Sequence, residues 1–416
     1  MGKYKLKCLS CNRYIEDHYT LRCNDCDSLL RVEYAERQLK VRYQLPGIWK
    51  YIGWLPVNDF FNCDTTIKTY KSNELAKELG LENLYISFTG YSPEIGVKNL
   101  SCTFKELESV PTYQRLKEKK KKGIILATAG NTGISFAYMS SITKIPVIIV
   151  IPENAKILVP EPEIDTVRLI AVQGNDYFSA IHLASRIKKD GFVPEGGAKN
   201  VARRDGMALV MVDAAFTIKS LPHHYFQAIG SGTGAVSAWE AALRLLEDGR
   251  FGKVKPKLHL SQNYPFAPVH NAWSRHANEI DIEKDMPNAY DSINKVKATM
   301  LTNRKPPYSI KGGDFDALSD TNGETYAVTN EELDAASKLF YESEGIDIVP
   351  EAAVAVGSLI KAIEEKKVNL KDIILLNITG AGFERIKEDY EIYQLKPNYI
   401  AQHKDVSLEE LPLEDL

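Results

Sequence analysis

The sequence predicts an α/β protein in which parallel strands alternate with helices, and two observations carry this prediction. From Asn73 onward, short apolar runs alternate with longer amphipathic segments, as strands and helices do in βαβ units. Three of the apolar runs also lead into loops of small residues. Ligands of open α/β sheets bind at such loops, where the strands end.

Chain length and charge narrow the class of protein further. The chain has 416 residues, more than one ordinary core, so two or three structural units are expected. Apolar residues make up 44%, charged residues 26%, and the net charge is −3, which describes an ordinary surface without a nucleic-acid partner. Residues 1–7 lack the apolar segment of a signal peptide, and no run approaches the roughly 20 apolar residues that span a bilayer. We therefore expect a cytoplasmic protein with no membrane partner.

The first 34 residues form a short, polar module that carries four cysteines. Cys8, Cys11, Cys23 and Cys26 make two C-x2-C pairs separated by eleven residues. This spacing predicts two knuckles that complete a tetrahedral, structural zinc site. The alternative, four unligated thiols in a loose tail, leaves nothing to hold so short a segment together. Because zinc ribbons also serve as binding modules, a non-enzymatic adaptor remains a second hypothesis.

The elements of the first half follow from their apolar spacing. Spacing near 3.6 predicts a helix, and a continuous apolar run predicts a strand that is buried on both faces. In chain order the sequence predicts a helix at 74–79, a strand at 83–88, a helix at 112–122, a strand at 123–127, a helix at 134–141, strands at 146–151 and 167–172, and a helix at 177–189.

The second half repeats the pattern around one segment that is hard to interpret. The same criteria predict a strand at 224–229, a helix at 236–246, a strand at 257–261, helices at 330–344 and 352–365, and a strand at 372–377. Residues 262–330 are rich in Asn, Pro, Gly and Lys. They are consistent with a lid, an oligomer contact or an insertion, and the sequence does not choose among these.

Three small-residue loops follow predicted strands. Gly230-Ser231-Gly232-Thr233-Gly234 opens a helix, so its backbone N–H groups can converge on an anion such as phosphate; a plain tight turn is the alternative. The loop Thr128-Ala129-Gly130-Asn131-Thr132-Gly133 places one amide and two hydroxyls at a strand end, and a helix cap is its alternative. The third loop, residues 379–382, supplies the Thr379 hydroxyl.

Lys105 lies in a polar context of small residues, Asn99-Leu100-Ser101-Cys102-Thr103-Phe104-Lys105. Most lysines are exposed charges, and a single one is catalytic only rarely. The combination with the three loops changes this interpretation. An aldehyde cofactor needs a lysine amine for its Schiff base, a phosphate cradle and neutral side chains around its ring.

These residues resemble the fold-type-II pyridoxal-phosphate enzymes, and within them the branch of threonine synthases and cysteate synthases. The resemblance covers nearly the whole chain and implies a tryptophan synthase β-like fold of two open twisted sheets with helices on both faces. It implies that Lys105 is the catalytic, cofactor-bearing residue and that the segment 230–234, Asn131 and Thr379 bind the cofactor. Implied substrate residues are Ser101, Thr103, Thr128, Ala129, Gly130, Thr132 and Arg203.

The chain also departs from the threonine synthases. They continue from the lysine with Asp-Arg-Gly, where this chain has Glu106-Leu107-Glu108. The run Thr103–Glu108, together with Trp54-Leu55-Pro56-Val57 and the cysteine module, is more similar to cysteate synthases. That similarity implies conversion of O-phospho-L-serine and sulfite to L-cysteate and phosphate, a step toward coenzyme M. A threonine synthase acting on O-phosphohomoserine and a cysteine synthase using sulfide are the alternatives within the family.

The predicted organisation has three parts. Residues 1–34 form the zinc-ribbon-like module, residues 35–110 and 215–416 the larger, cofactor-binding domain, and residues 111–214 the smaller α/β domain. Relatives with this fold are commonly dimers, so the resemblance also implies a homodimer or a higher homo-oligomer.

Overall fold

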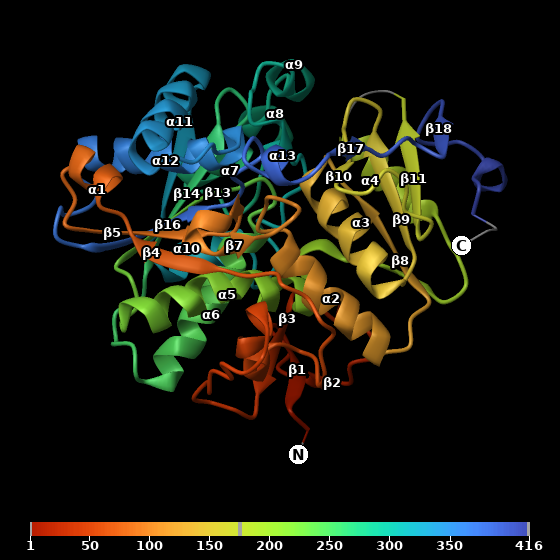
Figure 1. The fold of residues 1–416 in the computed structure, drawn as a ribbon, viewed down its shortest axis with the longest axis horizontal. Coiled ribbons are helices and arrows are strands. Elements are labelled where there is room, and N and C mark those ends of the chain that lie inside the picture. The colour runs from red at the N-terminus through yellow and green to blue at the C-terminus, as the bar shows by residue number, and fades with distance from the viewer. Residues whose placement is uncertain (1, 174–176, 414–416) are drawn as a thin grey trace.

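Two large sheets stand side by side in the computed structural model, which describes residues 2–173 and 177–413 (Figure 1). One sheet has six strands and the other has five. Helices lie on both faces of each, and a small three-stranded sheet packs beneath them near the N-terminus (Figure 1). The predicted α/β architecture with two sheets is confirmed.

The larger sheet has the strand order β15-β14-β13-β16-β5-β4. Its neighbours are parallel except at the edge, where β4 runs antiparallel to β5. Every residue of β13 is buried, which explains why the central strands read as unbroken apolar runs. The bounds are β4 Lys68–Lys71, β5 Asn83–Phe88, β13 His224–Ala228, β14 Lys257–Asn263, β15 Glu324–Val328 and β16 Ile373–Ile378.

The smaller sheet has the order β12-β8-β9-β11-β18, and all of its pairs are parallel. Its last strand, Tyr399–Ala401, comes from the C-terminal end of the chain and pairs with β11. Part of the segment 215–416 therefore lies on the smaller sheet, while the predicted domain boundaries stay a prediction. The other bounds are β8 Gly123–Ala127, β9 Val147–Pro152, β11 Val167–Val172 and β12 Phe192–Pro194.

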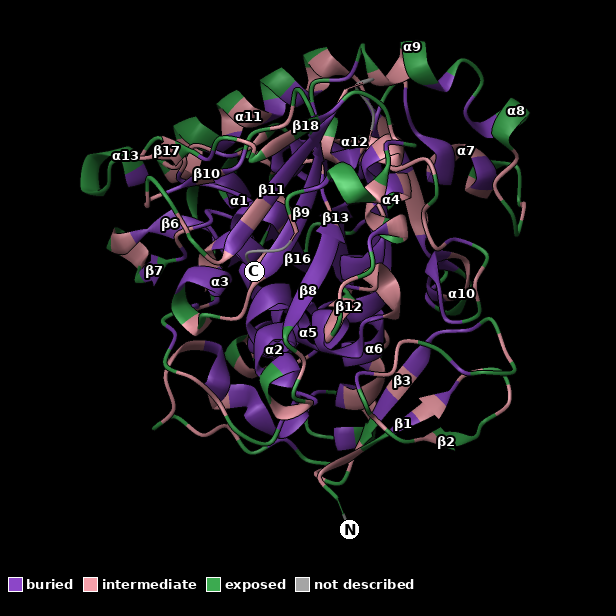
Figure 2. Ribbon diagram, turned by 90° about the vertical axis from the view of Figure 1, so that its right-hand side faces the viewer, coloured by how far each residue is buried: buried purple, intermediate pink, exposed green. Residues whose placement is uncertain are grey.

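Helices complete the layers. On the larger sheet, α12 packs on β13, β14 and β16, and α11 packs on α12; α5 contacts β4 and β5, and α6 contacts β14. In the smaller unit, α4 packs on β8 and β9, and α3 packs on β9 and β11. The sheets are buried throughout their centres, whereas α11 exposes its outer side (Figure 2). The bounds are α3 Asn131–Thr143, α4 Tyr177–Arg186, α5 Val201–Ile218, α6 Thr233–Asp248, α11 Asn330–Glu344 and α12 Pro350–Glu364.

The helix predicted at 112–122 is α2, and it begins earlier than predicted, spanning Glu106–Glu118. Pro111 lies inside this helix. Because proline has no N–H, the carbonyl of Leu107 lacks its usual partner. That carbonyl faces α5, where a Cβ added at Gly206 would lie 1.7 Å from the Leu107 oxygen. The two helices therefore cross in close contact at Gly206.

The segment 262–330 forms short elements around β14 and β15. They are α7 Pro268–Ser274, α8 Ile282–Asp285, α9 Ala289–Ile293, the 3-10 turn η4 Thr299–Leu301 and α10 Asp314–Asp320. Two further small elements precede α2: the helix α1 Glu74–Glu78 and the hairpin of β6 Tyr91–Ser92 and β7 Val97–Lys98. Among the described residues, no helix is both long and apolar enough to cross a bilayer.

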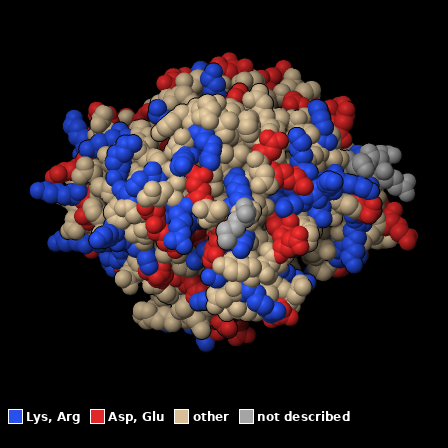
Figure 3. Space-filling view, turned by 90° about the horizontal axis from the view of Figure 1, so that it is seen from below, with Lys and Arg blue, Asp and Glu red and all other residues tan. Residues whose placement is uncertain are grey.

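The N-terminal module is an antiparallel sheet of order β2-β1-β3, with β1 Tyr4–Cys8, β2 Tyr14–Ile15 and β3 Leu30–Tyr34. Its main anchor is Arg115 of α2, which donates hydrogen bonds to Asp17 at 3.0 Å and to the Thr20 carbonyl at 3.0 Å. Burial alone would raise the pKa of Asp17, but the hydrogen bonds and charge of Arg115 lower it to about 2. The face of the molecule on the side of this module carries both charges interspersed (Figure 3).

We expect Arg115→Met to lower the free energy of unfolding by about 3 kcal/mol, because it removes the hydrogen-bonded cation of the Asp17 carboxylate and leaves only Lys119, 3.6 Å away. Urea unfolding at neutral pH measures the change. The control is Arg22→Met, which alters an exposed arginine and should shift stability by less than about 0.5 kcal/mol. Equal effects of the two substitutions would contradict the anchoring role of Arg115.

Candidate active site

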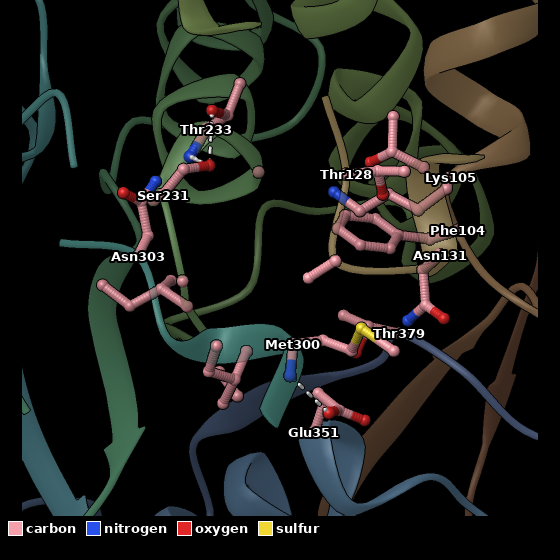
Figure 4. A pocket seen from close by; sticks show the side chains of 18 of the residues that line it. Phe104, Lys105, Thr128, Asn131, Ser231, Thr233, Met300, Asn303, Glu351 and Thr379 are labelled. Carbon is pink, nitrogen blue, oxygen red and sulfur yellow. Dashed lines mark hydrogen bonds between the residues drawn. The ribbon is translucent and has the colours of Figure 1, made fainter. Parts of the chain in front are cut away.

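A cavity lies where strands of both sheets end, and we call it the central cavity. Its walls come from segments far apart in the sequence: the turn before α2, the loops after β8, β13 and β16, and η4 (Figure 4). Most of the predicted site residues line it: Lys105, Thr128, Ala129, Gly130, Asn131, Thr132, Arg203, Gly230, Ser231, Gly232, Thr233, Gly234 and Thr379.

Ser101 and Thr103 are predicted substrate residues that the structure does not bring to the cavity wall. Both are buried. The Ser101 N–H donates to the Glu106 carboxylate at 2.5 Å, and the Ser101 and Thr103 hydroxyls lie 3.4 Å apart. They hold the turn that precedes Lys105.

Lys105 occupies the N-cap position of α2 at the cavity wall. Its side chain is 19% exposed, and Nζ lies 3.3 Å from Glu108 Oε2 and 4.6 Å from the centre of the Phe104 ring. Burial lowers the pKa of Lys105, and the Glu108 carboxylate opposes part of that effect. A larger fraction of the amine is therefore neutral than for a lysine in water, as a nucleophile or base requires.

The loop after β13 forms an anion-binding turn at the start of α6 (Figure 4). Gly232 has a φ of +69°, and a Cβ added there would lie 2.0 Å from Oδ1 of the buried Asp314. Only glycine fits this position. The Ser231 and Thr233 hydroxyls lie 2.9 Å apart at the same helix end, where free N–H groups and the helix dipole favour a phosphate.

The loop after β8 forms the opposite wall. The Thr128 hydroxyl accepts hydrogen bonds from the N–H groups of Gly130 at 2.9 Å and Gly133 at 3.2 Å, which closes the loop at the start of α3. Asn131 is the first residue of α3, and its amide points toward the cavity (Figure 4). The first N–H groups of a helix have no partner within it, so this end can bind a carboxylate.

Arg203 lies on the cavity wall but is already paired. Its Nη1 is 2.9 Å from Glu195 Oε2 and its Nε is 3.1 Å from Glu108 Oε2. Burial alone would lower the pKa of Arg203, and the two carboxylates raise it above the ordinary value instead. The predicted contact of Arg203 with substrate phosphate remains a prediction, because a phosphate there would compete with both carboxylates.

Sequence reasoning missed nine wall residues, and three of them come from η4 and α12. Met300, from the segment that was hard to interpret, donates its N–H to Glu351 Oε1 at 3.1 Å, and burial raises the pKa of Glu351. A methionine and a glutamate carry no local signal for a site. The missed residues are Phe104, Tyr177, Gln227, Ala228, Ile229, Met300, Leu301, Asn303 and Glu351.

These residues fit a phosphorylated pyridine aldehyde. The turn at 230–234 presents helix N–H groups and two hydroxyls that suit a phosphate, and the Thr379 hydroxyl suits a ring nitrogen as a neutral partner. Lys105 supplies an amine with a lowered pKa on the same cavity. The combination defines a site for pyridoxal phosphate.

The comparisons with known proteins agree with this class. Residues 65–380 match the family of pyridoxal-phosphate dependent enzymes, and the chain belongs to that family. Among curated proteins, it is 53% identical to the cysteate synthase of Methanosarcina acetivorans, with 99% of this chain and 100% of that protein aligned. It is 49% identical to the cysteate synthase of Methanocella arvoryzae, with 99% of each chain aligned. A non-enzymatic adaptor is therefore excluded.

Solved structures show the same fold at low identity. Maize serine racemase superimposes with a TM-score of 0.57 at 13% identity, over 77% of this chain and 90% of that one. A fungal L-serine ammonia-lyase from Rhizomucor miehei gives a TM-score of 0.57 at 13% identity, over 78% of this chain and 98% of that one.

The four cysteines of the N-terminal module converge as the sequence predicted. The sulfur atoms of Cys8, Cys11, Cys23 and Cys26 all lie within 4.8 Å of one another, and those of Cys11 and Cys23 are 3.9 Å apart. Zn–S bonds of about 2.3 Å place the sulfurs of a tetrahedral site about 3.8 Å apart. The cluster therefore fits a zinc ion with four thiolate ligands.

Glu106 should make stability depend on pH. Burial raises its pKa from 4.5 to about 7, against hydrogen bonds from Ser101 and Thr65. Because the folded-state value is the higher one, the stabilisation is present in full below about pH 4.5 and is lost as pH rises through 7. Glu106→Gln mimics the protonated form, so its stability relative to the wild type should increase by about 3 kcal/mol between pH 4 and 8. Urea unfolding at both pH values measures this, and a constant difference would contradict the assignment.

Proposed function

We propose that this enzyme makes L-cysteate from O-phospho-L-serine and sulfite by replacing the β-phosphate. The observation that carries the proposal is a lysine amine with a lowered pKa on a cavity that also contains a phosphate cradle. Alignment with cysteate synthases over 99% of the chain supports this choice among the reactions of the family.

The proposed cofactor contacts follow from the wall residues. The segment 230–234 would hold the phosphate of pyridoxal phosphate through backbone N–H groups and the hydroxyls of Ser231 and Thr233. Thr379 would be the partner of the ring nitrogen, Asn131 that of the phenolic oxygen, and Lys105 would supply the amine that holds the aldehyde. When bound, the cofactor withdraws electrons from the α-carbon of the substrate and so makes its proton acidic.

In this proposal Lys105 also moves the proton. Once released, its neutral amine takes the α-proton at Nζ, and the β-phosphate leaves with the electron pair of its C–O bond. Sulfite then adds to the β-carbon, and Nζ returns the proton to the α-carbon. Thr128, Ala129, Gly130 and Thr132 orient the substrate carboxylate at the start of α3, which fixes the α-carbon near Nζ.

The proposal extends to the cellular location and the oligomeric state of the enzyme. Six cysteines without a disulfide among the described residues are typical of a reducing compartment, which supports a cytoplasmic location. Assembly into a homodimer or higher homo-oligomer is proposed from the family resemblance alone.

The substrate assay tests the proposed function. Purified enzyme with O-phospho-L-serine and sulfite should release phosphate and form L-cysteate, whereas O-phosphohomoserine should release no phosphate. Lys105→Ala should abolish turnover and the cofactor absorption near the visible edge, while Lys68→Ala, at an exposed lysine of β4, should retain both. Phosphate release from O-phosphohomoserine alone would assign the enzyme to the threonine synthases instead.

We further propose that the cysteine cluster holds a structural zinc ion, because four protein ligands leave no open position for catalysis. Purified protein should contain about one zinc per chain, and Cys8→Ser should lose it together with part of the thermal stability. Metal analysis and a melting curve measure both. Cys63→Ser alters a buried cysteine outside the cluster and should leave the zinc content unchanged. Equal zinc in both variants would contradict the site.

A further inference from the structure

Glu108 is a buried carboxylate next to Lys105 to which the proposed chemistry assigns no role. It follows Lys105 by three residues, so both side chains lie on the same face of α2. Glu108 has an exposure of 0%, and its Oε2 lies 3.3 Å from Lys105 Nζ and 3.1 Å from Arg203 Nε. Burying a carboxylate costs several kcal/mol unless cations pair with it. Lys105 and Arg203 place two cations at ion-pair distance from this carboxylate.

Arg203 holds Glu108 in place independently of Lys105. Its guanidinium is tethered by Glu195, whose Oε2 also accepts a hydrogen bond from the Gly197 N–H at 2.9 Å. This arrangement fixes the Glu108 carboxylate even when the Lys105 side chain moves. In the part of the chain that the structure describes, Glu108 Oε1 has no hydrogen-bond partner, so the carboxylate can accept a further proton donor.

We propose that Glu108 is the positioning residue of Lys105: it accepts the hydrogen bond of the protonated amine whenever Lys105 is free, and so keeps Nζ at the cavity wall. The inference rests on the proposed function, in which Lys105 alternates between a covalently attached state and a free state that carries a proton. Without Glu108, a flexible lysine released from its covalent bond has no anchor at the reacting carbon. Glu108 itself does not line the cavity and acts through Lys105.

The charges around Lys105 predict the direction in which its pKa changes when the charge of Glu108 is removed. Burial and Arg203 disfavour the protonated amine, whereas Glu108 and Glu195 favour it. Tyr177 lines the same cavity, and burial raises its pKa to about 12, so it stays neutral. Removal of the Glu108 charge leaves burial and Arg203 opposed by Glu195 alone. The pKa of Lys105 must then fall.

The experiment measures the protonation of Lys105 in the full-length, cofactor-free protein. Acetic anhydride acetylates only the neutral amine, and mass spectrometry of the Lys105 peptide gives the rate at each pH. In Glu108→Gln the midpoint of this profile should fall by about one pH unit or more, so labelling below both midpoints should rise about tenfold. Glu118→Gln, at the far end of α2, should keep the wild-type profile.

A second variant covers the case in which Glu108→Gln does not fold. Glu108→Asp keeps the charge but moves it back by one bond. The midpoint of the labelling profile should shift in the same direction as in Glu108→Gln, by a smaller amount. An unchanged midpoint in the variant that folds overturns the proposal, as does a rate change that is equal at all pH values. The labelling needs no substrate. A failed assay with O-phospho-L-serine would therefore refute the proposed function without altering this measurement.

Discussion

The close crossing of α2 and α5 is the constraint on which the candidate site depends. Leu107 and Gly206 touch across it, with the Leu107 carbonyl oxygen 1.7 Å from the place where any larger residue would put its Cβ. Pro111 leaves that carbonyl without a helical partner, and Gly206 lets the second helix approach it. Because Lys105 and Glu108 belong to α2 and Arg203 belongs to α5, this contact sets the distances among the three charges. A wider crossing would separate the carboxylate from both cations.

The N-terminal module stabilises the same two helices from outside. Arg115 of α2 pairs with Asp17, and Arg204 of α5 donates to the carbonyl of Leu30 in β3 and pairs with Glu240 at 3.0 Å. The four paired side chains are at most 5% exposed, so the pairs are expensive to break. A zinc ion in the module would thus act on the site through the positions of α2 and α5. This explains physically how a closed metal site far from the chemistry can belong to an enzyme.

Much of the fold and part of the site could be predicted from the sequence, and the difference follows from the range of the interactions. Buried parallel strands such as β9 and β13 appear in the sequence as continuous apolar runs. The glycines and threonines of the loops after such strands follow from the local backbone geometry of those loops. The convergence of the cysteines also follows from local spacing. The predicted start of α2 was wrong, because the helix continues back through Pro111 to Glu106, where the Leu107 carbonyl faces Gly206, a residue 95 positions after Pro111 in the sequence. The pairing of Arg203 with Glu108 and Glu195 depends on tertiary packing of the same kind and has no local pattern.

The turn at η4 shows most clearly what the sequence could not reveal. Met300 approaches the Gly130 loop, where an added Cβ would lie 2.4 Å from its Cε, and its carbonyl oxygen lies 3.1 Å from the Cβ position of Gly230. One short turn thus contacts the loops of both sheets, and Glu351 fixes it by accepting the Met300 N–H (Figure 4). Glycine at both contact points leaves room for the turn. The two glycines therefore serve two purposes at once: they shape the loops at the strand ends, and they admit the segment that joins the two halves of the cavity.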